Sequence, residues 1–487
     1  MHPIAAISWE DFLAIWSPVA TAAHIALATF ASAHVVLRKR DTRAAIGWAG
    51  LIWFSPLFGA ALYWGFGINR IRRKAHLLRG QPYGKLQAGT LVGTASSYRQ
   101  GVEKISLLPL ATLVGHVTQL PLLEGNRIEL LTQDDDPHGQ MLAAIDAAEK
   151  SVALATYIFD NDATGQRFVE SLGQAVARGV QVRVLIDGIG MRYSRPNILR
   201  RLRERNVPVE RFLYSMIPFW SPYSNLRNHR KIMVADGKLG FTGGMNIRRA
   251  KSPDAKESDG VHDAHFRVEG PVVSHLRQTF ADDWLFCKEE TLAGEAWFPP
   301  LAPLGQVEAR GIPDGPDENV DKLHLAIMGA LACAQSSVYI VTPYFLPDAA
   351  LISALNVAAL RGVAVNIVLP KVNNLALVQW AATAQFWQVL QRGCRVWLSP
   401  PPFDHSKLMV VDRAWSLVGS GNWDPRSLRL NFEFNLECYD SQLAGQIVRL
   451  IESKLRRAEE ITLAEVDGRS LPIRLRDGLA RLLSPYL

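Results

Sequence analysis

The feature of this sequence that most constrains the fold is an internal duplication. The stretch HRKIMVADG at residues 229–237 has a counterpart, HSKLMVVD, at residues 405–412, and both follow the pattern His-x-Lys-x-x-x-x-Asp. The phrases ahead of them repeat as well, since SVALATYIFDND from Ser151 matches SVYIVTPYFLPD from Ser337. A repeat of this length predicts two lobes that share one fold.

Each lobe carries the signals of a parallel β-α-β unit. In AVARGVQVRVLID (175–187) and AALRGVAVNIVLP (358–370), Arg-Gly-Val closes a helix and opens an apolar strand. Such apolar strands predict a sheet that helices cover on both faces. We therefore expect an α/β fold of two duplicated α/β/α sandwich lobes, at residues 120–300 and 301–460, joined by the Pro- and Gly-rich stretch 302–318.

Two long apolar runs precede the lobes. Residues 12–37 and 44–68 contain no Asp, Glu, Lys or Arg. Each run exceeds the ~20 residues that cross a bilayer core of ~30 Å. Glu10 and Asp11 stand where a signal peptide would carry basic residues. We expect residues 1–78 to form a membrane anchor with two membrane helices.

Basic clusters follow both runs, at residues 38–43 and 70–74, and such clusters favour the cytoplasmic side of a membrane. Two full spans would place the clusters on opposite faces. Alternatively, the second run could dip and return at Pro56 as a re-entrant segment, which would leave both clusters cytoplasmic. We expect two full spans, hence a multi-pass protein with cytoplasmic lobes, and a connector at residues 79–119.

The two motifs supply paired imidazole and ammonium groups. Each motif opens a strand that turns and returns, and side chains alternate along a strand, so the histidine and lysine of each copy share a face. The aspartates have the opposite parity and sit by the turn, where we expect them to brace the loop through hydrogen bonds. The candidate catalytic residues are His229, Lys231, Asp236, His405, Lys407 and Asp412.

Small and amide residues follow each motif at matching offsets. Gly-Gly or Gly-Ser comes fourteen and fifteen residues after each histidine, and an asparagine comes at seventeen. Small residues let the backbone approach an anion, and the amide adds a neutral donor. A carboxylate on the far nitrogen of each ring would hold its tautomer. The supporting candidates are Gly244, Ser420, Asn246, Asn422, Asp263 and Glu433.

Two imidazoles and two ammonium groups around one site can split a phosphodiester in two steps. A neutral imidazole attacks phosphorus, while a protonated imidazole gives its proton to the leaving oxygen. Both states are accessible near a free pKa of ~6.5. We expect no cofactor and no metal, because an ammonium two residues from each imidazole repels a divalent cation, and the sequence contains no HExxH or CxxC motif.

At these residues the sequence resembles the phospholipase D superfamily, and most closely its bacterial cardiolipin synthases. The matching stretches are the paired apolar segments, YIFDND, RNHRKIMVADGKLGFTGGMNI, HFRVEGPV, TPYFLPD, HSKLMVVD, VGSGNWDPRSLRLNFEFN and ARLLSPYL. The resemblance implies transfer of a phosphatidyl group between two phosphatidylglycerol molecules, giving cardiolipin and glycerol through a phosphohistidine. It also implies His229 as nucleophile, His405 as acid and base, and the bacterial inner membrane as location.

The expected partners are phosphatidylglycerol, other anionic phospholipids and the membrane. The aromatic stretch 212–223 and the basic amphipathic tail at 461–487 favour lobes that are held against a bilayer. We expect no nucleic acid, because the basic residues lack an aromatic platform for single strands. Three functions stay open: cardiolipin synthesis, hydrolysis to phosphatidic acid or transfer to another head-group acceptor, and a nuclease-like or phosphodiester-binding protein.

Overall fold

The structure is a computed structural model that describes residues 9–39, 42–67, 102–213, 226–249, 260–316 and 321–484. The chain divides into two compact units: an N-terminal unit, whose described part lies within residues 1–74, and an α/β unit that holds both motifs. Most of the aromatic stretch, residues 214–225, lies outside the described residues.

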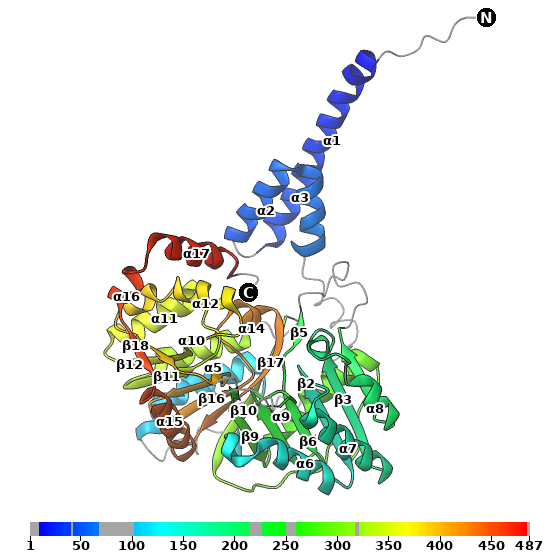
Figure 1. Cartoon of the computed structure of the whole chain (residues 1–487), viewed down its shortest axis with the longest axis vertical. Helices are drawn as coiled ribbons and strands as arrows, with labels where there is room; N and C mark the ends of the chain where they lie inside the picture. The colour runs from blue at the N-terminus through cyan, green and yellow to red at the C-terminus, as the bar shows by residue number, and fades with distance from the viewer. Residues whose placement is uncertain are drawn as a thin grey trace, which may run out of the picture. The chain divides into compact units, whose positions relative to one another are not determined.

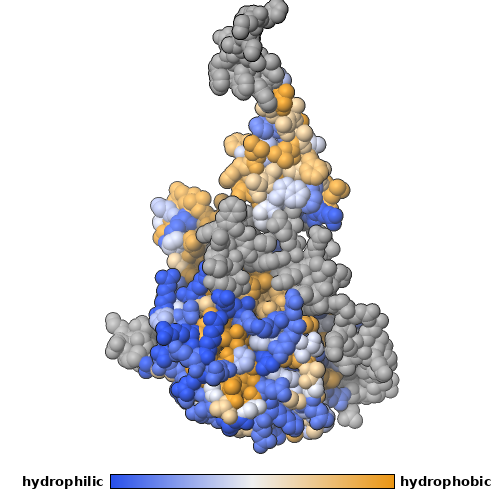
Figure 2. Space-filling view, turned by 90° about the vertical axis from the view of Figure 1, so that its right-hand side faces the viewer, coloured by the Kyte–Doolittle hydropathy of each residue, from blue (hydrophilic) through white to orange (hydrophobic). Residues whose placement is uncertain are grey.

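The N-terminal unit contains one helix that is long and apolar enough to cross a membrane. This helix is α1 (Trp9–Arg38), in which the 21 residues from Pro18 meet both conditions. It is the one such helix among the described residues. In Figure 2 the visible face of this unit is largely hydrophobic, as suits contact with lipid.

The second apolar run does not form a second span. It is divided at Ser55, because α2 (Thr42–Phe54) ends before it and α3 (Pro56–Leu62) begins after it, followed by the π-helix η1 (Tyr63–Gly67). Ser55 is the N-cap of α3 and Pro56 its first residue, a position where the missing N–H of proline is tolerated, so a new helix begins there. The 13 residues of α2 are about 20 Å long, too short for a core of ~30 Å. The prediction of two spans and a multi-pass anchor is therefore not supported.

The second run instead folds back on itself. A Cβ at Gly59 would come within 2.5 Å of the Leu51 carbonyl oxygen, so α3 packs closely on α2. The Tyr63 ring lies 5.5 Å from the Trp48 ring, and its hydroxyl lies 2.8 Å from Nδ1 of His34 on α1. The start of α2 and the end of η1 therefore lie at the same end of a helical hairpin, as in the re-entrant alternative.

The α/β unit contains two lobes (Figure 1), and their strands follow the same order. In lobe 1, three parallel strands continue into an antiparallel set, in the order β4-β3-β2-β6-β7-β9-β1. Lobe 2 repeats this order as β13-β12-β11-β15-β16-β17-β10. The predicted duplicated α/β fold is thus confirmed.

The strands of the α/β unit follow in chain order. Those of lobe 1 are β1 (Leu123–Leu131), β2 (Ser151–Thr156), β3 (Gln181–Asp187), β4 (Val209–Phe212), β5 (Arg227–Asn228), β6 (Ile232–Ala235), β7 (Leu239–Gly243), β8 (Val261–His262) and β9 (His265–Glu269). Those of lobe 2 are β10 (Val307–Asp314), β11 (Ser337–Val341), β12 (Ala364–Pro370), β13 (Arg395–Ser399), β14 (Phe403–Asp404), β15 (Leu408–Val411), β16 (Trp415–Gly419), β17 (Asn431–Tyr439) and β18 (Glu459–Ile461).

Helices cover the sheet of each lobe. Those of lobe 1 are η3 (Gln133–Asp135), α6 (Pro137–Ala147), α7 (Ala163–Ala177), η4 (Gly190–Tyr193), α8 (Leu199–Glu204) and α9 (Val273–Lys288). Those of lobe 2 are α5 (Val102–Thr118), α10 (Lys322–Cys333), α11 (Ala349–Leu360), α12 (Ala376–Thr383), α13 (Trp387–Leu390), α14 (Pro425–Arg429), α15 (Ser441–Leu455), α16 (Leu463–Asp467) and α17 (Leu471–Leu482). In both lobes the predicted β-α-β unit is present, because β2 pairs in parallel with β3 and β11 with β12.

Two segments that were expected to be connectors belong to the folded lobes. The stretch 302–318 contains β10, which pairs with β17 of its own lobe and with β1 of lobe 1. Residues 102–118 form α5, whose Leu107, Leu110 and Val114 lie in the core of lobe 2. The β1–β10 pair makes the sheets of the two lobes continuous and fixes the lobes against each other.

The hairpin predicts the sidedness of the segment after α1. If the hairpin enters and leaves the membrane on the cytoplasmic side, as in the re-entrant alternative, Thr42 is cytoplasmic. In a chain whose four cysteines are serine, a cysteine at Thr42 should then resist a membrane-impermeant maleimide in intact cells and react after permeabilisation. A cysteine at Ile4, ahead of the single span, is the matched control and should react in intact cells. Labelling of the Thr42 variant from outside would exclude the re-entrant arrangement.

Candidate active site

The histidine of each motif lies on a segment that crosses to the other lobe. Ahead of His229, β5 pairs in parallel with β17 of lobe 2, and the His229 N–H donates to the Phe432 carbonyl at 2.9 Å. Ahead of His405, β14 pairs with β8 of lobe 1, and the His405 N–H donates to the His262 carbonyl at 2.7 Å. The backbone of the opposite lobe therefore positions each histidine.

Each imidazole also contacts a carboxylate of the opposite lobe. Nδ1 of His229 lies 3.0 Å from both carboxylate oxygens of Glu433 and 3.1 Å from the Ser420 carbonyl oxygen. Nδ1 of His405 lies 2.7 Å from Oδ2 of Asp263. A ring nitrogen that faces a carboxylate carries the proton, so in the neutral ring the lone pair is on Nε2. This geometry leaves both Nε2 atoms in the form that can attack or accept a proton.

The two lysines of the motifs are buried beside the histidines. Nζ of Lys231 donates to the His229 carbonyl at 2.5 Å, and Nζ of Lys407 donates to the His405 carbonyl. Burial lowers the pKa of Lys231 to about 7, with Glu433 opposing the shift and Lys407 adding to it. Burial also lowers the pKa of Lys407 to about 8, against the attraction of Asp263 and Glu433. Both ammonium groups thus titrate near neutral pH.

The imidazoles are neutral when no substrate is bound. Burial lowers the pKa of His405 to about 4, helped by Lys407 and opposed by Asp263. Burial likewise lowers the pKa of His229, opposed by Glu433 and helped by both lysines. Lys231 helps to lower the pKa of His405, and Lys407 helps to lower the pKa of His229. The charged groups of the two motifs therefore share one site.

The motif aspartates hold the turns of the two hairpins. Asp236 accepts a hydrogen bond from the Lys150 N–H at 2.7 Å, and Asp412 accepts one from the Ser336 N–H at 2.7 Å. Both aspartates have a φ of 51°, in the left-handed region that tight hairpin turns require. These contacts agree with the predicted bracing role.

The small residues after each motif make room for the buried carboxylates. A Cβ at Gly244 would come within 2.1 Å of Oδ1 of Asp263. At the matching place in lobe 2, the Ser420 hydroxyl donates to Glu433 at 2.5 Å. Burial acts to raise the pKa of Glu433, but His229, Lys231 and this hydroxyl outweigh it and hold the pKa below its usual value. Glu433 is therefore an anion inside the site.

The asparagines connect the motif loops to neighbouring segments. Oδ1 of Asn246 accepts a hydrogen bond from the Ile158 N–H at 3.1 Å. Nδ2 of Asn422 donates to the Ser427 hydroxyl at 3.2 Å. That donor is already engaged within lobe 2, so contact of Asn422 with a phosphate oxygen remains a prediction.

Sequence reasoning missed two tyrosines at the site. The Tyr157 ring meets the His229 ring edge-on with centroids 5.1 Å apart, and the Tyr344 ring meets the His405 ring with centroids 6.3 Å apart. Tyr157 directly follows Thr156, the last residue of β2, and Tyr344 comes two residues after Thr342, which directly follows β11. This repeated Thr-Tyr or Thr-Pro-Tyr was the signal that could have identified them.

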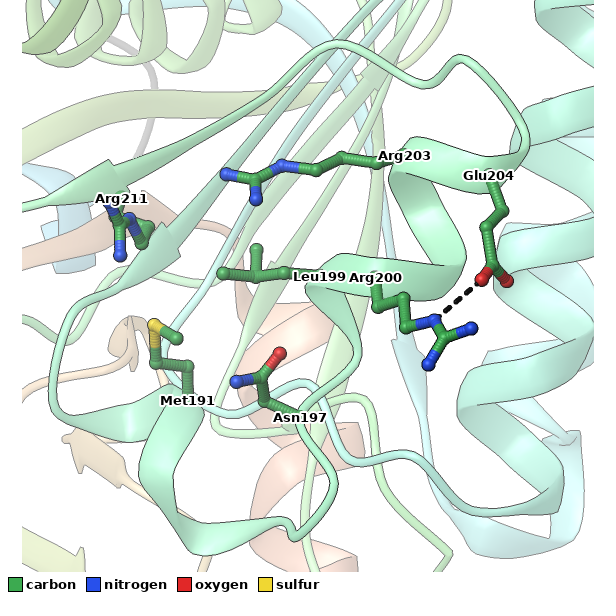
Figure 3. Close-up of a pocket in the computed structure, with 7 residues that line it drawn as sticks. All are labelled: Met191, Asn197, Leu199, Arg200, Arg203, Glu204 and Arg211. Carbon is green, nitrogen blue, oxygen red and sulfur yellow. Dashed lines mark hydrogen bonds and ion pairs between the residues drawn. The ribbon is translucent and has the colours of Figure 1, made fainter.

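A separate hollow of about 510 Å³ lies on lobe 1 (Figure 3). Its lining residues are Met191, Asn197, Leu199, Arg200, Arg203, Glu204 and Arg211. In Figure 3 the guanidinium of Arg203 points toward Arg211, whereas Arg200 pairs with Glu204 at 2.7 Å. Neither motif histidine lines this hollow, so it is not the reaction site.

Comparison with known proteins identifies the family. A family model described as "Cardiolipin synthase, PLD-like domain" matches residues 141–284 and 327–455, and one described as "Phospholipase_D-nuclease N-terminal" matches residues 26–67. The chain belongs to the phospholipase D-like cardiolipin synthase family. The resemblance predicted from the sequence is thus confirmed.

Members of the cardiolipin synthase family match nearly the whole chain. The major cardiolipin synthase ClsA of Bacillus subtilis (strain 168) is 32% identical over 461 residues, which cover 92% of this chain and 95% of that protein. A cardiolipin synthase of Staphylococcus aureus (strain N315) is 30% identical over 481 residues, 94% of each chain. The crystal structure of phosphatidylserine synthase from Haemophilus influenzae Rd KW20 covers 78% of this chain and 100% of that chain with a TM-score of 0.60, at 16% identity, and shares the fold.

The lowered lysine pKa values predict how activity depends on pH. An ammonium that binds an anionic phosphate is present below its pKa and is lost as the pH rises, so kcat/KM should fall as the pH rises through about 7 to 8. In Lys231→Arg the larger guanidinium fits the site less well, so activity should be lower overall. Because the guanidinium keeps its charge, the fall in kcat/KM should move toward the pKa of Lys407. Initial rates in mixed micelles measure this profile. A kcat/KM that stays constant to pH 9 would contradict it.

Proposed function

We propose that this chain is a cardiolipin synthase that transfers a phosphatidyl group from one phosphatidylglycerol molecule to another, giving cardiolipin and glycerol. The main support is a composite site, meaning one site formed by both lobes. In it a carboxylate of the opposite lobe orients each imidazole, and two buried lysines lie beside the imidazoles. Family membership and the apolar helix α1 support a lipid substrate and a location in the bacterial inner membrane, with the lobes on the cytoplasmic side.

The first step forms a covalent intermediate. Nε2 of His229 attacks phosphorus and the bond to the glycerol head-group oxygen breaks, while His405 gives that oxygen its proton. The products are phosphatidyl-His229 and free glycerol, with His405 left neutral. The ammonium groups of Lys231 and Lys407 stabilise the negative charge on the non-bridging oxygens.

The charge balance of the site explains how His405 becomes an acid. Below the pKa values of both lysines, and without substrate, two ammonium groups balance Asp263 and Glu433, while the low pKa of His405 keeps its ring neutral. A bound phosphodiester adds one negative charge, and a nearby negative charge raises the pKa of an imidazole. A proton on His405 restores neutrality, so substrate binding creates the acid that the first step needs.

The second step reverses these roles. Neutral His405 takes the proton from a head-group hydroxyl of a second phosphatidylglycerol, the oxygen of that hydroxyl attacks phosphorus, and His229 leaves. One phosphodiester replaces another, so no energy-rich nucleotide is consumed. Water could take the place of the lipid hydroxyl, and the product would then be phosphatidic acid.

The proposal predicts the products from a single lipid. The purified chain in membranes with phosphatidylglycerol alone should form cardiolipin and glycerol in equal amounts. Chelator should have no effect, and added glycerol should suppress cardiolipin because it drives the reverse reaction. Product analysis by mass spectrometry measures both. If phosphatidic acid dominates at neutral pH, the chain is a hydrolase and the proposal is wrong.

Variants provide the control for this experiment. His405→Ala should lower turnover by roughly a thousandfold or more, because residues that act as a unit fail together. The matched control is His116→Ala, an exposed histidine on α5, which should keep wild-type turnover. Substantial cardiolipin formation by His405→Ala would contradict the proposal that His405 is the acid of the first step and the base of the second.

A further inference from the structure

The C-terminal helix α17 exposes the side chains that a surface helix normally buries. In α7, by contrast, Phe168 and Leu172 are buried against the sheet, as in an ordinary amphipathic helix. In α17, Leu475 and Leu479 are exposed, whereas Asp477 is only 1% exposed. The polarity of α17 is thus inverted with respect to the lobe on which it lies.

The exposed leucines form one stripe. Successive residues of an α-helix are about 100° apart, so spacings of four, eight and eleven residues fall within an arc of about 80°. We call this row the leucine stripe; its exposed fractions are 67% for Leu471, 58% for Leu475, 65% for Leu479 and 69% for Leu482.

Arginines flank the leucine stripe on both sides. By the same rotation, Arg474 and Arg481 lie along one edge and Arg476 lies beyond the other, and all three are exposed. Long cationic side chains beside an apolar stripe can extend toward phosphate groups while the leucines enter the acyl region. The pattern therefore suits the surface of an anionic bilayer.

Contacts on the inner face hold α17 in this orientation. Asp477 accepts hydrogen bonds from Arg476 at 2.7 Å and from Arg469. The guanidinium of Arg476 also lies 4.4 Å from the centre of the Trp380 ring on α12. Figure 1 shows α17 running over α12. The contact of Arg476 with Trp380 and the burial of Ala480 in the core of lobe 2 therefore hold α17 with its leucines facing outward.

We propose that α17 is an interfacial helix, whose leucine stripe inserts into an anionic phospholipid bilayer while Arg474 and Arg481 bind lipid phosphates. It is a membrane attachment additional to α1, and it does not depend on the reaction that the active site performs. A second copy of the chain fits this face less well, because a two-fold contact between identical stripes would bring arginines of like charge together.

Fluorescence quenching in membranes tests the proposal. The full chain, with its native cysteines replaced by serine, carries an environment-sensitive fluorophore on Leu479→Cys and is reconstituted in vesicles of phosphatidylglycerol and phosphatidylcholine. Nitroxide-labelled lipids should quench this fluorophore at least about threefold more than one on Gln174→Cys, an exposed control position on α7. The helix α1 keeps both variants on the vesicles, so the comparison reports α17 alone.

Further variants and vesicle compositions distinguish the possible outcomes. Arg474→Gln together with Arg481→Gln should reduce lipid quenching at position 479, as should vesicles of phosphatidylcholine alone. Quenching by aqueous iodide and not by nitroxide lipid would overturn the proposal. Efficient disulfide formation between two Leu479→Cys chains would also overturn it, because a second copy would then cover the stripe. Cardiolipin formation by the same samples, measured separately, tests the proposed function.

Discussion

The contacts between each histidine and the carboxylate of the opposite lobe are the interactions on which the rest of the structure depends. Glu433 is completely buried, and a buried ion without a partner costs several kcal/mol. His229 and Lys231 of lobe 1 are the partners of Glu433, so lobe 2 alone does not balance the charge of this carboxylate. The continuous sheet through β1 and β10, with the crossing pairs β5–β17 and β14–β8, holds the lobes in the register that these contacts need.

The two halves of the duplicated site are not equivalent. Nδ1 of His229 faces both oxygens of Glu433 and the Ser420 carbonyl, whereas Nδ1 of His405 contacts one oxygen of Asp263. A nucleophile must keep one orientation through attack and departure, and the more extensive contacts of His229 suit that role. An imidazole that gains and loses a proton on Nε2 needs its tautomer held, which a single carboxylate oxygen achieves. The assignment of His229 as nucleophile and His405 as acid and base, which the resemblance implies, remains a proposal.

Local sequence patterns predicted the repeated β-α-β units, both motifs and the two carboxylates. They could do so because the alternation of side chains in a strand and the glycine that ends a helix depend only on neighbouring residues. It failed where distant contacts decide the structure. Strand β10 looks like a loop because it contains Pro313 and the charged Arg310, yet Arg310 is buried and pairs with Glu437 at 2.5 Å. Likewise, apolar composition marked the second membrane run but could not show that it reverses at Pro56. Which carboxylate serves which imidazole depends on the docking of the lobes, and no local pattern encodes that.

The most direct test of the composite site is the stoichiometry of the covalent intermediate. Rapid quenching after mixing with phosphatidylglycerol labelled at its phosphate should trap at most one phosphatidyl group per chain, on His229, with one glycerol released per group. A single site with one nucleophile requires this result. Labels on both His229 and His405 at two per chain would show two independent sites, and glycerol release without any covalent label would contradict the two-step reaction.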